Sequence, residues 1–103
     1  QLMEASRHLA NRIMKEGGQT TTERAGYLFE LATARPPLSG ELETLVEVHD
    51  RSLASYQGGP EKATQVLSHG DSENTTTFPA PEQAAWTLVA SLILNLDEVL
   101  TRN

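Results

Sequence analysis

The stretch P-E-Q-A-A-W-T-L-V-A-S-L-I-L-N-L-D-E-V-L-T-R, residues 81–102, decides the fold of this 103-residue chain. Proline is tolerated in the first turn of a helix, and after Pro81 neither proline nor glycine interrupts the stretch. Apolar residues cover an arc of roughly 160° on the helical wheel, and they are Ala85, Leu88, Val89, Leu92, Ile93, Leu96, Val99 and Leu100. We therefore predict one long buried C-terminal helix, wrapped by the preceding helices with no room left for a reactive cleft.

The remaining positions of this helix divide into two groups. Trp86 extends one edge of the apolar arc, and Leu94 lies outside it on the far side. Asn95 and Glu98 lie along the opposite edge with other polar residues. Because two sides of the helix need cover, we predict that apolar surface such as Leu94 and Trp86 packs on another domain or on a partner protein.

Shorter helices are predicted upstream of this stretch, at residues 2–16, 20–34, 39–56 and 60–68. Gly17-Gly18 ends the first, since glycine accepts the left-handed geometry of a C-terminal cap. Thr20 and Glu23 form a capping box, and Ser39 is the candidate N-cap of the third helix. No run alternates at period two for long enough to form a strand. We predict an all-α fold, a compact bundle of four to five helices, with an exposed loop at residues 70–80.

Length and composition limit the classes of function. The chain fits one domain, residues 1–103, and 14 acidic against 8 basic residues give a net charge of −6. Nucleic-acid binding is not expected, because the basic residues are scattered along an acidic chain. The absence of cysteine excludes disulfides and thiolate metal sites. Membrane insertion is not expected, because polar residues interrupt the last apolar run. The chain opens on Gln1 already in helical pattern, so we expect an excised C-terminal part of a larger protein.

His49 is the histidine of interest, because it falls on the apolar face of the third helix between Leu45 and Leu53. One interpretation is a core histidine whose ring nitrogens are both hydrogen-bonded. The other is a ligand-binding or acid–base role, which needs a carboxylate or a second histidine nearby in space. His8 projects onto a polar helix face, and His69 precedes a glycine at a helix end, where a cation suits the helix dipole.

Arg35 lies at the edge of the apolar side of the second helix, where an unpaired guanidinium is costly. We expect it to pair with an acid in a buried site, with Glu98 as the first candidate and Glu41 as the second. A pair with Glu98 would tie the Pro36-Pro37 turn to the C-terminal helix. In the alternative, Arg35 extends along the surface and caps carbonyls of its own helix.

No reaction emerges from the sequence. It contains no glycine-rich phosphate loop, no His-Glu-x-x-His motif and no serine elbow, and Asp71-Ser72-Glu73-Asn74 is too short and irregular for a calcium loop. We therefore predict no catalytic, cofactor-binding or metal-binding residues. The structural polar candidates are Arg35, Glu41, His49, Asn95 and Glu98.

Several strings together resemble a known family. They are Leu28-Phe29-Glu30-Leu31-Ala32-Thr33-Ala34-Arg35-Pro36-Pro37 followed by Glu41-Leu42, then Ala84-Ala85-Trp86, and Leu94-Asn95-Leu96-Asp97-Glu98. The opening Glu4-Ala5-Ser6-Arg7-His8-Leu9-Ala10 fits the same pattern. They resemble the C-terminal region of a bacterial family of unknown function, whose large members are typical of planctomycetes and are associated with cytochrome-c-like domains. An aromatic residue is usual in that family where Val99 stands here.

The resemblance implies a periplasmic or cell-envelope location and a non-catalytic module, and it carries no catalytic residue over to this chain. We accordingly expect a helical accessory or interaction domain of an exported multidomain protein, with upstream domains or another protein as partner. The alternative is a supporting domain of an enzyme or electron-transfer protein whose haem or active site lies upstream. A third possibility is a small-ligand or metal-binding bundle centred on His49.

Overall fold

The computed structural model describes the backbone of residues 2–67 and 78–101 and the side chains of residues 4–67 and 78–95. Within these residues the chain forms five helices and no strand: α1 (Leu2–Glu16), α2 (Thr21–Thr33), α3 (Ser39–Gly58), α4 (Pro60–Leu67) and α5 (Ala80–Thr101). The predicted all-α bundle is confirmed. Most of the loop predicted at residues 70–80, together with His69, lies outside the described residues.

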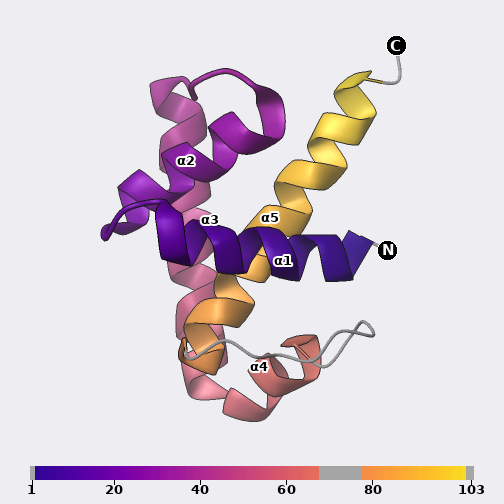
Figure 1. Cartoon of the computed structure of the whole chain (residues 1–103). Coiled ribbons are helices and arrows are strands. Elements are labelled where there is room, and N and C mark those ends of the chain that lie inside the picture. Colours follow the sequence, from indigo (N-terminus) through magenta and orange to yellow (C-terminus); the bar gives the residue numbers. More distant parts are fainter. Residues whose placement is uncertain (1, 68–77, 102–103) are drawn as a thin grey trace.

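Helix α5 is the central element of the fold. It contacts each of the other four helices and makes its largest interfaces with α1 and α3. In Figure 1, α1 crosses α3 and α5, while α2 and α4 lie toward opposite ends of the molecule. The predicted long C-terminal helix is therefore confirmed. No helix in the described part of the chain combines the length and apolarity needed to span a membrane.

Local signals set the boundary between α1 and α2. Gly18 follows α1 with a φ of 103°, which a side chain rarely accepts, and a Cβ there would lie 2.9 Å from the Glu23 Cβ. The capping box is present: the Glu23 amide donates to Thr20 Oγ1 at 3.1 Å, and the Thr20 amide donates to Glu23 Oε1 at 3.2 Å. The turn between the two helices is thus fixed by residues within it.

Helix α3 begins differently from the prediction. The N-cap is Leu38, not Ser39, and Ser39 is the first helical residue. Leucine has no side-chain acceptor, but its backbone amide donates to Glu41 Oε1 at 2.9 Å. A carboxylate in the first turn also suits the positive end of the helix dipole. Glu41 therefore compensates for the missing N-cap side chain.

The main core lies where α1, α2, α3 and α5 meet. Its buried members are Ala10, Ile13, Met14, Ala25, Leu28, Phe29, Leu45, Trp86, Val89, Ala90 and Ile93. A smaller cluster of Ala63, Leu67 and Ala84 joins α4 to α5. Trp86 is fully buried, so the prediction that it offers a docking surface is wrong. Its burial is possible because the indole N–H has an acceptor inside the protein.

The buried face of α5 also differs from the predicted arc. Ala85, Val89 and Ile93 are buried as expected, but Leu88 and Leu92 are 40% and 38% exposed. These two leucines lie one helical turn apart on the same face. We call them the aliphatic strip of α5. The structure leaves uncovered a part of the helix that the sequence pattern predicts to be covered.

Two polar residues of α5 are buried in place of the aliphatic strip. Gln83 and Thr87 are fully buried. The Gln83 side-chain amide donates to Asn11 Oδ1 of α1 at 2.8 Å, and the Thr87 hydroxyl donates to the Gln83 carbonyl at 2.8 Å. Polar groups with partners are buried at little net cost. The helix therefore turns this side inward against α1 and the strip outward.

Candidate functional site

A buried polar cluster joins α3 to α5 around His49. The histidine is 1% exposed. Its Nε2 lies 2.9 Å from Glu82 Oε1, and its Nδ1 lies 3.0 Å from Asp50 Oδ1. The Glu82 side chain is 24% exposed, whereas that of Asp50 is 64% exposed. We call His49, Glu82 and Trp86 the histidine cluster. Its geometry is that of a core histidine with both ring nitrogens hydrogen-bonded.

Glu82 connects the other members of the histidine cluster. Its Oε1 accepts a hydrogen bond from Trp86 Nε1 at 2.9 Å in addition to the contact with His49. The rings of His49 and Trp86 are 4.4 Å apart between centroids and inclined by 35°. Arg24 of α2 approaches the same carboxylate oxygen at 3.9 Å. One carboxylate thus links α2, α3 and α5.

The electrostatics of the cluster favour an ion pair. Burial by itself lowers the pKa of His49, but the hydrogen bonds and charges of Glu82 and Asp50 outweigh it, so the pKa is raised. The hydrogen bond from His49 lowers the pKa of Glu82 against the opposing effect of burial. Both ring nitrogens donate only in the imidazolium form. The shifts therefore favour a positive ring between two carboxylates.

This arrangement suits structural support rather than acid–base catalysis. A general acid or base must exchange a proton with a substrate through an accessible atom. Both ring nitrogens of His49 are already bonded to carboxylates, and the ring is buried. Among the described residues no group of three or more histidines, cysteines, aspartates or glutamates is arranged to hold a metal ion.

The histidine cluster predicts a pH dependence of stability. The pKa of His49 is higher in the folded chain than its unfolded value of about 6.5. The contribution of His49 to the free energy of unfolding is therefore complete below about pH 6.5, and it is lost as pH rises through the folded-state pKa. Glu82 behaves oppositely: its contribution is complete above its unfolded pKa of about 4.3 and is lost as pH falls through its lowered folded value.

Urea denaturation over a series of pH values tests this expectation. The parent should lose stability above neutral pH. His49→Gln should lose less over the same interval, because this variant lacks the titrating ring at position 49. His8→Gln is the matched control, since His8 is exposed on α1. Parallel pH profiles for the parent and His49→Gln would contradict an ion pair at this position.

Arg35 pairs with Glu41, which was the second candidate. Its Nη1 and Nη2 donate to Glu41 Oε1 and Oε2, each at 2.9 Å. The hydrogen bonds from Arg35 and the Leu38 amide lower the pKa of Glu41 to about 2. The side chains are 48% and 35% exposed, so the pair is not in the dry site that was expected. The guanidinium carbon also lies 4.8 Å from the centre of the Phe29 ring.

The Arg35–Glu41 pair therefore joins the end of α2 to the start of α3. A second contact, from Arg35 Nη1 to the Pro36 carbonyl at 3.3 Å, holds the guanidinium over the turn rather than over carbonyls of α2. The side chain of Glu98, the first candidate, lies outside the described residues. Asn95 lies exposed on α5, apart from the histidine cluster.

Sequence reasoning missed Glu82 and Asp50 as partners of His49, and Arg24 as a second partner of Glu82. Asp50 follows His49 directly in α3, whereas the positions of Glu82 and Arg24 depend on how α2, α3 and α5 pack, which the sequence pattern does not contain. One local signal was present: Glu82 precedes Trp86 by four residues, the spacing at which helical side chains meet. That spacing could have indicated an acceptor for a buried indole N–H.

Two surface hollows flank the aliphatic strip. The first, which we call the apolar groove, has a volume of about 510 Å³ and contains Leu92 with Phe29, Leu38, Leu45 and Ile93. The second, the hydroxyl cleft, has a volume of about 500 Å³ and contains Leu88 with Ser52, Ser55, Tyr56 and Lys62. Each hollow is thus lined by one leucine of the aliphatic strip.

The fold and these sites define a class: a small all-α fold that has, among the described residues, a buried histidine cluster and two surface hollows beside the aliphatic strip. No family model matches the chain, and neither a curated protein nor a solved structure is significantly similar to it. The resemblance to the planctomycete-type family therefore stays a prediction.

Proposed function

We propose that this chain is a non-catalytic interaction domain whose apolar groove binds an amphipathic helix of a neighbouring domain or partner protein. The observation that carries the proposal is the exposure of Leu92. This residue belongs to the apolar arc of α5, which the sequence predicts to be covered. Leu38 is 67% exposed beside it in the same groove. Covering such side chains releases about 25 cal/mol for each Å² of apolar surface.

The lining of the groove supports an apolar ligand. Its polar side chains are already satisfied within the protein, since Glu41 is bound to Arg35 and the Thr44 hydroxyl donates to the Gly40 carbonyl at 2.9 Å. A docked apolar face would therefore leave neither of them without a partner. Leu45 and Ile93 are buried at the base of the groove, where they give a rigid apolar surface.

The shape of the groove favours a helix as the ligand. The groove is lined by residues of two long helices, α3 and α5, and by Phe29 at the end of α2. A helix with aliphatic residues three and four positions apart presents a row of side chains that fits such a groove. The net charge of −6 further favours a helix whose polar face carries lysine or arginine.

Within the proposal, the chain is part of an exported, multidomain bacterial protein. This rests on the resemblance to the planctomycete-type family. The buried histidine cluster then supports the fold on which the groove is built, since Glu82 links α5 to α3.

Binding of an amphipathic test peptide to matched variants examines the proposal. The peptide carries a row of leucines at helical spacing and a lysine-rich opposite face. We expect it to bind the parent in the groove and to bind Leu92→Glu more than about tenfold more weakly, because the introduced carboxylate would be desolvated. Leu88→Glu is the control, since Leu88 has nearly the same exposure but lies in the hydroxyl cleft.

Circular dichroism establishes that both variants remain helical before binding is compared. An equal loss of peptide affinity in Leu92→Glu and Leu88→Glu would contradict specific binding in the apolar groove. Absence of saturable binding to the parent would contradict the proposed function itself.

A further inference from the structure

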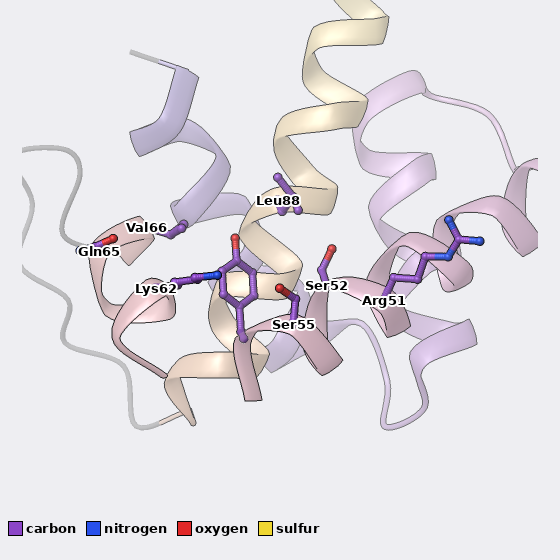
Figure 2. Close-up of a pocket in the computed structure, with 8 residues that line it drawn as sticks. Arg51, Ser52, Ser55, Lys62, Gln65, Val66 and Leu88 are labelled. Atoms are coloured by element: carbon purple, nitrogen blue, oxygen red, sulfur yellow. The ribbon is translucent and has the colours of Figure 1, made fainter. Parts of the chain in front are cut away.

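The hydroxyl cleft lies between α3, α4 and α5, apart from the apolar groove and the histidine cluster. Figure 2 shows Ser52 and Ser55 on α3, Lys62 on α4 and Leu88 on α5. Tyr56 of α3 also lines the cleft. We propose that this cleft binds a small organic acid, with its carboxylate at the hydroxyl groups and Lys62 and its apolar part against Leu88.

The hydroxyl groups of the cleft are free to bind a ligand. Hydroxyls of helical threonines elsewhere in the chain donate to the carbonyl four residues earlier, as in Thr33, Thr44, Thr64 and Thr87. Those of Ser52, Ser55 and Tyr56 make no hydrogen bond to any described residue. Because Ser52 is only 8% exposed, its hydroxyl depends on water or a ligand in the cleft.

Tyr56 is suited to donate a hydrogen bond in this cleft. A phenol with the ordinary pKa of about 10 keeps its proton at neutral pH, and burial raises the pKa of Tyr56 further. Lone pairs of a carboxylate accept hydrogen bonds from several hydroxyl donors at once. A ligand without an acceptor would leave these donors unused.

The charge of the cleft is opposite to that of the chain. The protein has 14 acidic and 8 basic residues, yet the described residues that line the cleft include Arg51 and Lys62 and no acid. Lys62 forms no ion pair with a described residue. Arg51 pairs with Glu47 at the surface and extends away from Lys62 in Figure 2. Lys62 is therefore the cation available to an anionic ligand.

The other properties of the cleft narrow the class of ligand. A single available lysine matches one negative charge. Leu88 and Val66 add apolar surface beside the polar groups. The volume of about 500 Å³ lies in the range of small-molecule sites. A monocarboxylate with a short aliphatic or aromatic tail satisfies all three features.

Titration of the whole chain with hexanoate, followed by amide NMR shifts, tests the inference. We expect saturable shifts at Ser52, Ser55 and Lys62 in the millimolar range. Lys62→Met should weaken binding about tenfold, because it keeps the aliphatic length and removes the charge. Lys15→Met is the matched control, since Lys15 is the other lysine and lies exposed on α1. Leu92→Glu should bind as the parent does, which separates this site from the apolar groove.

Four outcomes would overturn the inference. Hexanol shifts equal to those of hexanoate would show that the carboxylate is not recognised. Inorganic phosphate binding as tightly as hexanoate would show a general anion site. Equal weakening by Lys62→Met and Lys15→Met, or no saturable shift in the cleft, would show that Lys62 does not bind the ligand.

Discussion

Replacing Glu82 with alanine is expected to lower the free energy of unfolding by about 3 kcal/mol. The substitution removes the acceptor of two buried donors, His49 Nε2 and Trp86 Nε1, each 2.9 Å from Glu82 Oε1. A buried donor left without an acceptor costs about 1–3 kcal/mol. Loss of the carboxylate also removes the charge that helps to keep His49 protonated.

Two further variants make the Glu82 measurement specific. Glu61→Ala also removes one acidic side chain from the first turn of a helix, but Glu61 is exposed on α4, so we expect little change. Glu82→Gln keeps an acceptor and should lose less stability than Glu82→Ala. Urea denaturation at pH about 6, where His49 is expected to be charged, gives the free energy of unfolding of all three variants. Equal stability of Glu82→Ala and Glu61→Ala would contradict the linking role of Glu82.

Replacing Trp86 with alanine is expected to lower the free energy of unfolding by about 4 kcal/mol. Trp86 is fully buried in the main core, and alanine would leave a cavity between α5 and its neighbours. The substitution also removes the ring that lies 4.4 Å from His49 and the donor to Glu82. A loss of this size is a large fraction of the stability of a small domain.

Trp86→Phe keeps the measurement informative if Trp86→Ala does not fold. Phenylalanine retains most of the apolar volume but has no N–H, so the expected loss is about 1–2 kcal/mol. Thermal unfolding followed by circular dichroism compares the variants, because alanine and phenylalanine remove the fluorescent indole. A Trp86→Ala variant that unfolds at the same temperature as the parent would show that the ring is not part of the core.

The features predicted correctly from sequence are those that depend on nearby residues. The capping box of Thr20 and Glu23 and the positive φ of Gly18 are set within a few residues of each other. The length of α5 follows from the lack of a helix breaker across its apolar run. Such signals act before any tertiary contact forms, which is why a single sequence contains them.

The features that could not be predicted depend on contacts between distant segments. The rotation of α5 follows from the bond between Gln83 and Asn11, 72 residues apart. A hydrophobic pattern counts Gln83 as a surface residue because it has no information on such a partner. His49 likewise reaches Glu82 across 33 residues. Arg35 is an exception, because its partner Glu41 is only six residues away and yet is the second candidate from the sequence. The Leu38 amide binds Glu41 at the start of α3 and so holds it beside Arg35.

Amide hydrogen exchange tests most directly whether α5 is the buried centre of this fold. We expect the amides of residues 84–93 to exchange slowest in the chain, at the rate set by global unfolding, because this segment is packed against the other four helices. Amides of the short α4 should exchange faster through local opening. Exchange in residues 84–93 as fast as in α4 would contradict the central position of α5.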